Sequence, residues 1–276
     1  MSFPTLLAHL ELGRSNAELL AVTGDLAERF GAAVIGVAAC QPVQMLYGDG
    51  FLAGEVIEQD RADIGKEFKG AEAEFQTALH GRANSLEWRS LITFAPLCDF
   101  IVREARCADL VVTGPGLPAP LFDTARHVNI SDLVMQCGRP VLTVPKGAAG
   151  LPLKRAVVGW KDTRETRRAV LDAVPLLQKA RTVTVVEIAG ELDLAEARTR
   201  LGDVVRWLRR HGVEAEARAE LSRGEDAEQL SVVTNELGAD LIVAGAYGHS
   251  RMREWVLGGV TQDLLLSADR CALVSH

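Results

Sequence analysis

One stretch of this chain occurs twice, and the repeat limits the folds that the sequence can adopt. Residues 108–114 read Ala-Asp-Leu-Val-Val-Thr-Gly, and residues 239–245 read Ala-Asp-Leu-Ile-Val-Ala-Gly, which is an offset of 131 (239 − 108). The same offset pairs residues 132–133 with residues 263–264, both Asp-Leu. Repetition over so long a distance indicates two copies of a whole domain rather than a solenoid of short units.

The repeated stretches are continuous apolar runs that end at a glycine, which is typical of a buried strand in a parallel sheet. Further strands and helices are expected at residues 5–10, 15–30, 33–38, 155–160, 164–179 and 182–188. Strands that alternate with helices of this length predict βαβ units, a parallel sheet and right-handed crossovers. We therefore expect an α/β protein made of two domains.

The boundary between the domains is expected at residues 147–152, which are small residues followed by a proline. This gives domains at residues 1–146 and 153–276. The N-terminal parts of the two halves align at an offset of 152, with Asn16 opposite Arg168, whereas their C-terminal parts align at 131. The first half therefore has 21 extra residues (152 − 131) between these parts. Residues 41–60 contain a proline and three glycines, and they are expected to hold this insertion as a loop that enters the next helix.

A second pattern begins at the glycine that ends the second repeated run. Two residues separate its first two glycines, nine separate the next, and a helix-like stretch follows. The pattern comprises Gly245, Gly248, Gly258, Gly259, Val260 and Thr261. Glycines at a strand end let backbone N–H groups approach a ligand, and a helix N-terminus offers unpaired donors to an anion. The pattern therefore suggests a phosphate cradle.

This Gly-x2-Gly-x9-Gly spacing resembles the nucleotide-binding signature of the universal stress protein family. Residues 160–169 resemble the family's passage from the first strand into the first helix, and residues 224–230 resemble its turn into the third helix. The second half matches over nearly its full length, whereas the first half matches in its strands but not in its glycines. The chain thus resembles a tandem universal stress protein.

The resemblance implies two open, mostly parallel, five-stranded, Rossmann-like domains. Proteins of this family commonly pair through their last strands, so residues 140–144 and 271–275 are expected at the centre of an internal pseudo-dimer. Association of two such chains into a homodimer stays open.

The resemblance also implies an adenine nucleotide, with ATP as the expected ligand, with or without Mg²⁺, in the C-terminal domain. The base would lie against the ends of the first two strands, at Gly159, Trp160 and Val186. The ribose and phosphates would follow the glycine pattern to the helix start. Ligands of open α/β sheets generally bind at this edge, near the point where the strand order reverses.

Two positions depart from the family. Gly259 lacks the hydroxyl group that the family uses on the phosphates, and a hydrogen bond to a charged group contributes roughly 1.5–3 kcal/mol. Lys161 stands where the family usually has Asp, which either supplies a phosphate partner or removes a ribose or metal contact. An alternative interpretation of the glycines is that they serve tight packing and a helix start.

The first half lacks the glycine pattern. At an offset of 131, its counterparts of the later glycines are Leu117, His127 and Val128, and residues 115–120 are rich in proline, which removes amide donors. We expect a degenerate, structural copy, in which His127 as an anion contact is the minor alternative.

Composition narrows the function classes. A net charge of −7 argues against nucleic acid and anionic membranes as partners, and no apolar run reaches the roughly 20 residues of a membrane span. Five dispersed cysteines indicate small buried side chains in a reducing cytoplasm. The sequence contains no GxSxG, HExxH or Walker motif.

The expected function is therefore that of a cytoplasmic stress-response protein that binds an adenine nucleotide without catalysis, or with slow hydrolysis at most. The alternative is a scaffold that has lost nucleotide binding and acts through protein partners. An enzyme of adenylyl chemistry is the third hypothesis, which the absence of a catalytic motif disfavours.

Overall fold

The computed structural model describes residues 2–42, 52–116, 126–246 and 269–276, and the side chains of α2 from residue 57 onward. The elements of the first half are β1 (Thr5–His9), α1 (Ala17–Phe30), β2 (Ala33–Cys40), α2 (Leu52–Leu79), β3 (Leu86–Ile92), α3 (Leu97–Glu104), β4 (Leu110–Thr113), α4 (Ile130–Gln136) and β5 (Val141–Thr143). Those of the second half are β6 (Arg155–Gly159), α5 (Arg164–Leu177), β7 (Thr182–Ala189), α6 (Leu194–Arg210), β8 (Ala215–Leu221), α7 (Asp226–Glu236), β9 (Leu241–Gly245) and β10 (Cys271–Ser275). Short 3-10 turns lie at Ala105–Cys107 and Glu191–Asp193.

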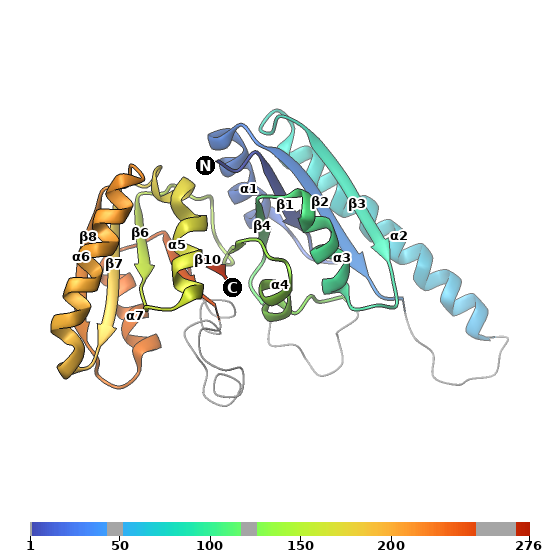
Figure 1. The fold of residues 1–276 in the computed structure, drawn as a ribbon. Coiled ribbons are helices and arrows are strands. Elements are labelled where there is room, and N and C mark those ends of the chain that lie inside the picture. The colour runs from blue at the N-terminus through green and yellow to red at the C-terminus, as the bar shows by residue number, and fades with distance from the viewer. Residues whose placement is uncertain (1, 43–51, 117–125, 247–268) are drawn as a thin grey trace.

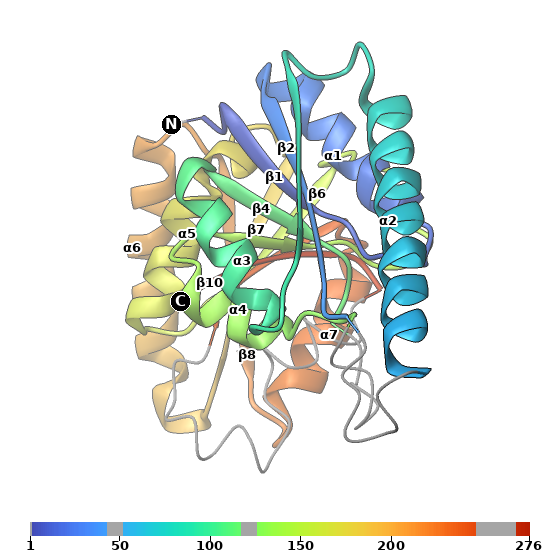
Figure 2. The ribbon, with the colours of Figure 1, turned by 90° about the vertical axis from the view of Figure 1, so that its right-hand side faces the viewer.

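The strands of the described residues form a single sheet in the order β3-β2-β1-β4-β5-β10-β9-β6-β7-β8 (Figure 1). Pairing is parallel within each half, and β5 pairs antiparallel with β10 at the centre, with Leu142 opposite Leu273. The expected mostly parallel α/β fold and the central pairing of the last strands are both confirmed. Figure 2, viewed from the β3 end, shows successive strands turning relative to one another, as sheets of L-amino acids do.

Helices cover both faces of the sheet. One large apolar cluster covers one face and joins the halves, since it contains Leu20 of α1, Phe75 of α2, Ala169 of α5 and Leu201 of α6. The opposite face is covered by α3 and α4 in the first half and by α7 in the second. This division follows from right-handed crossovers, because the chain first moves outward along the sheet and then returns on the other side.

The repeated Ala-Asp pair has the same structural task in both halves. The Asp109 carboxylate accepts a hydrogen bond from Thr5 N at 2.9 Å, and Asp109 N donates to Thr5 O. In the second half, the Asp240 carboxylate accepts from Lys154 N at 2.7 Å, and Asp240 N donates to Arg155 O. Each aspartate therefore fixes the start of the first strand of its half.

The insertion in the first half lies between β2 and β3. Strands β2 and β7 begin 149 residues apart (33 and 182), whereas β3 and β8 begin 129 apart (86 and 215), so 20 extra residues fall in this interval. Residues 41–60 were expected to be a loop that enters the next helix, and the helix occupies this segment from residue 52 onward, since α2 begins there and has 28 residues against 17 in α6. Helix extension, rather than a loop, accommodates much of the insertion.

The linker between the halves packs against α1. Leu151 is fully buried, its N–H donates to Asp25 Oδ2 at 2.8 Å, and its carbonyl accepts from Arg29 at 3.0 Å. A proline and small residues thus predicted a boundary, but they did not predict that the segment is fixed to the first half. No helix of the described residues is both long and apolar enough to cross a membrane.

Candidate functional site

The strand order of the second half reverses between β6 and β9, and five predicted site residues lie at or beside this point. Gly159 is in register with Val186 of β7 on one side and with Ala244 of β9 on the other. Trp160 and Lys161 follow Gly159, and Gly245 follows Ala244. The carboxyl edge of β6, β7 and β9 therefore brings together Gly159, Trp160, Lys161, Val186 and Gly245, as the sequence predicted.

The space above Gly159 is filled by the protein itself. A Cβ atom added at Gly159 would lie 2.9 Å from Leu230 Cδ2 of α7. Val186 is fully buried in the same apolar cluster as Leu230. The lack of a side chain at Gly159 is therefore explained by the approach of α7, and the predicted surface for a base is covered on this face of the sheet.

Gly245 is also explained by a close approach. An added Cβ would lie 2.7 Å from the carbonyl carbon of Glu165 and closer still to Thr166 N, both in the first turn of α5. Backbone atoms of a helix cannot yield to a methyl group as a flexible side chain can. At this position the packing interpretation of the glycine pattern has direct structural support.

Trp160 presents an unmet hydrogen-bond donor. Its backbone N–H donates to Val186 O at 2.7 Å, but its indole Nε1 is buried and has no hydrogen-bond partner among the described residues. A buried donor without a partner costs about 1–3 kcal/mol, so such groups are rare away from functional sites.

Lys161 is an exposed cation at this edge. It follows Trp160 directly and precedes Asp162, whose carboxylate pairs with Arg167 at 2.8 Å. Thr163 caps α5 by accepting a hydrogen bond from Thr166 N at 3.3 Å. The negative charge of Asp162 is thus paired. Lys161, in contrast, is exposed to solvent at the point where the strand order reverses, and it is accessible to an anion there.

An ion pair between a buried glutamate of β7 and a half-buried arginine of α6 was not predicted from the sequence. Glu187 of β7 is 6% exposed and pairs with Arg200 of α6 at 2.7 Å, and this hydrogen bond raises the pKa of Arg200. Glu187 Oε2 and Arg200 Nε have no further partner among the described residues. The available signal was a single glutamate inside an otherwise apolar strand.

The other predicted site residues lie outside the described residues. These are Gly248, Gly258, Gly259, Val260 and Thr261.

The corresponding edge of the first half has a different character. His9 ends β1, is 3% exposed and hydrogen-bonds through Nδ1 to Thr113 Oγ1 at 2.9 Å. Burial, reinforced by nearby His127, lowers the pKa of His9 to about 4. His127 Nδ1 lies 4.0 Å from Glu11 Oε2. Imidazole rings thus fill positions where the second half has glycines.

The cavity at this edge of the first half is small. It measures about 80 Å³, and Glu11, Arg14, Gly114 and Lys146 are among the residues that line it. Binding pockets for small molecules typically measure about 300–1,000 Å³. The cavity formed by the described residues is smaller than this range.

The described residues contain no group of side chains suited to a metal ion. Cys40, Cys98 and Cys271 are buried, and burial raises the pKa of Cys98 and Cys271 to about 12. Cys107 is exposed and Cys137 is half-buried. The prediction of small, buried cysteine side chains is therefore confirmed for three of the five cysteines.

Residues 152–275 match the model of the Universal stress protein family. The second half is accordingly a universal stress protein domain. No curated protein matches the chain.

Solved structures resemble the chain over its whole length. A universal stress protein from Archaeoglobus fulgidus DSM 4304 has a TM-score of 0.74 at 13% identity, covering 98% of this chain and 95% of that one. A putative universal stress protein from Pseudomonas aeruginosa UCBPP-PA14 has a TM-score of 0.60 at 13% identity, covering 99% and 93%. A functionally unknown protein from Pseudomonas aeruginosa PAO1 has a TM-score of 0.58 at 13% identity, covering 99% and 92%. At this identity the likeness concerns the fold alone.

Proposed function

We propose that the chain is a tandem universal stress protein, with domains at residues 1–146 and 153–276, whose C-terminal domain binds an adenine nucleotide. ATP is the proposed ligand, with or without Mg²⁺, and the protein acts in the cytoplasm without catalysis or with slow hydrolysis at most. The single observation that carries the proposal is the convergence of Trp160, Lys161 and Gly245 at the switch point of the domain that matches the family.

The described side chains at this edge are compatible with an anionic nucleotide. Lys161 is exposed and would meet a phosphate group, and Trp160 Nε1, which has no hydrogen-bond partner in the described part of the chain, would donate to an acceptor on the ligand once the indole turns toward it. The negative charge at the site would come from the phosphate groups of the nucleotide. Mg²⁺ would bind together with the nucleotide, since the described residues contain no group of side chains suited to a metal ion. The chain's own part is to bind and orient the nucleotide.

The tandem arrangement has its own support. Each half contributes five strands in equivalent order, 3-2-1-4-5 and 8-7-6-9-10, and each half uses the aspartate of its Ala-Asp pair to fix its first strand. Only the second half keeps the glycine pattern, so one nucleotide per chain is proposed.

A second candidate function rests on a specific observation. Leu230 occupies the space above Gly159, and α5 lies against Gly245, so both glycines have packing roles that need no ligand. A scaffold that acts through protein partners is therefore the alternative.

Calorimetric titration of the full chain with ATP, with and without Mg²⁺, distinguishes the two. We expect one site per chain and at least a tenfold weaker affinity in Lys161→Glu, because a lost charge-assisted hydrogen bond contributes roughly 1.5–3 kcal/mol. Lys154→Glu is the matched control, since Lys154 is an exposed lysine at the opposite end of β6 and its reversal should leave the affinity unchanged. Absence of heat with the wild-type chain would favour the scaffold.

A further inference from the structure

The helices on one face of the sheet differ in charge between the two halves. Helices α1 and α2 together contain ten acidic and four basic residues, a net charge of −6. Their counterparts α5 and α6 contain four acidic and eight basic residues, a net charge of +4. The separation of charge concerns the helices of this face, since residues 151–276 as a whole contain 18 Lys and Arg against 19 Asp and Glu, a net charge of −1 (18 − 19).

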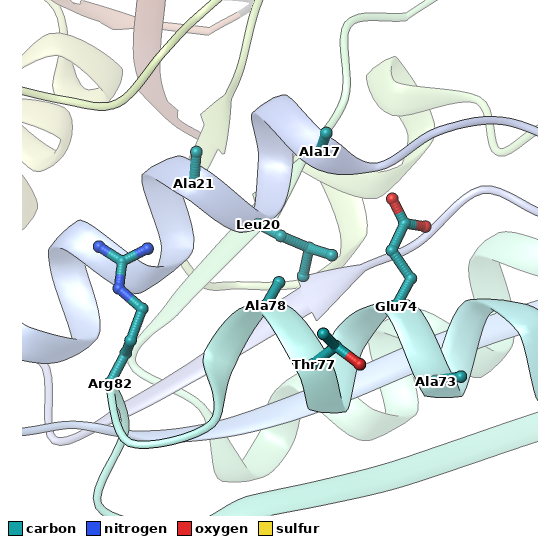
Figure 3. A pocket seen from close by; sticks show the side chains of 8 residues that line it. All are labelled: Ala17, Leu20, Ala21, Ala73, Glu74, Thr77, Ala78 and Arg82. Atoms are coloured by element: carbon teal, nitrogen blue, oxygen red, sulfur yellow. The ribbon is translucent and has the colours of Figure 1, made fainter.

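The acidic end carries a groove between α1 and α2 (Figure 3). It measures about 530 Å³ and is lined largely by small side chains: Ala17, Ala21, Ala73, Thr77 and Ala78. Glu74 also lines it and accepts a hydrogen bond from Asn16 N at 2.9 Å. Arg82 lines it too, but its charge is offset by Asp25 at 2.8 Å and Glu28 at 2.6 Å. The groove thus combines an apolar floor with Glu74 and an Arg82 side chain that is paired with two carboxylates.

The basic end presents an arginine-rich helix face. In α6 the side chains of Ala197, Leu201, Val204 and Leu208 are buried, which turns the opposite side of the helix to solvent. That side carries Arg198, Arg206, Arg209 and Arg210, all exposed. Arg206 pairs with Asp203, and Arg209 lies 3.6 Å from Glu214, but exposed pairs of this kind contribute at most about 1 kcal/mol. The arginines are therefore available to a partner.

Helices α2 and α6 lie at opposite ends of the molecule (Figure 1), so they cannot meet within one copy. We propose that a second copy of this chain is the partner: the arginine face of α6 in one copy docks over the α1–α2 groove of the next, head to tail. Complementary charge steers the approach, and a groove floored by alanine lets a helix come close. Because the two surfaces differ, the contact either closes a ring or extends a chain of copies.

Sedimentation velocity of the full chain tests this association. We expect association in about 50 mM NaCl and at least a tenfold weaker association in about 500 mM, where the screening length falls to a few ångströms. Ala73→Arg should abolish it by filling the groove and reversing its charge, whereas Ala62→Arg, at an exposed site of α2 outside the groove, should not. Arg206→Glu with Arg210→Glu should also abolish it, whereas Lys179→Glu with Arg223→Glu, which changes the net charge equally, should not.

A mixture of the two disrupted variants gives the sharpest result. The Ala73→Arg chain keeps its α6 face and the Arg206→Glu/Arg210→Glu chain keeps its groove, so the mixture should form a complex of two chains although neither variant associates alone. A chain that stays monomeric at low salt, or an association that salt and both variants leave unchanged, would overturn the proposal. Binding to anionic vesicles through the same arginines by a chain that stays monomeric would overturn it as well, and would assign the face to membranes.

Discussion

The stability of the protein should fall between pH 6.5 and pH 4 because of one buried imidazole. His9 is 3% exposed, and its pKa is lowered from 6.5 to about 4 by burial and by the neighbouring His127. Above pH 6.5, His9 is neutral in both the folded and the unfolded state. Between pH 6.5 and pH 4 the His9 imidazole binds a proton in the unfolded chain but not in the folded chain, so a fall in pH favours unfolding. Below pH 4 both states are protonated and the effect is complete.

The size of the effect follows from the two pKa values of His9. Each pH unit between them corresponds to about 1.4 kcal/mol, so the fall from 6.5 to about 4 corresponds to about 3 kcal/mol of stability. Small domains are stable by about 5–15 kcal/mol, which makes this a substantial part of the total.

Urea unfolding of His9→Gln across this pH range isolates the contribution, because an amide hydrogen-bonds to Thr113 without titrating. The free energy of unfolding of the wild type, minus that of the variant, should fall by about 3 kcal/mol from pH 7.5 to pH 4. The contributions of titrating carboxylates cancel in this difference. Thr113→Val is the control, since it removes the hydrogen bond but keeps the buried imidazole and its pH dependence. A difference between wild type and His9→Gln that stays constant with pH would refute the reasoning.

Two further predictions concern the backbone of both halves. Gly245→Ala should destabilise the protein by several kcal/mol, since the new methyl group meets the backbone of α5 at Thr166, whereas Gly70→Ala, in open space on α2, should be neutral or stabilising; thermal unfolding measures both, and equal melting temperatures would contradict the packing account. Asp240→Ala and Asp109→Ala should each cost about 1–3 kcal/mol in urea unfolding, because each leaves backbone N–H groups at a strand start without their acceptor, and unchanged stability in either would show that water replaces the carboxylate.

The repeated segments predicted the positions of strands correctly, because strands that are covered on both faces of a parallel sheet are recognisable as local apolar runs in the sequence. The positions of β4 and β9, and the central pairing of β5 with β10, followed from the repeat offset and the family resemblance. The start of α2 at residue 52 was not predicted, since Gly54 was interpreted as part of a loop, although a helix tolerates a single glycine at a cost of about 1 kcal/mol.

The candidate site was predicted only at the level of the chain's path. Sequence placed Gly159 and Gly245 at the correct edge, but it could not show that Leu230 and Thr166, 71 and 79 residues away from them (230 − 159 and 245 − 166), fill the space beside them. Likewise, nothing local connects Glu187 with Arg200 as a buried pair. Contacts across a sheet face depend on tertiary packing, which neither periodicity nor motif spacing encodes.

The antiparallel pairing of β5 with β10 has a consequence for how the protein behaves on dilution. Two separate chains that met through such strands would part once their concentration fell below the dissociation constant of the pair. Here both strands belong to one molecule, so their pairing does not depend on the concentration of the protein. The central pair of strands can therefore open only by unfolding and never by dissociation.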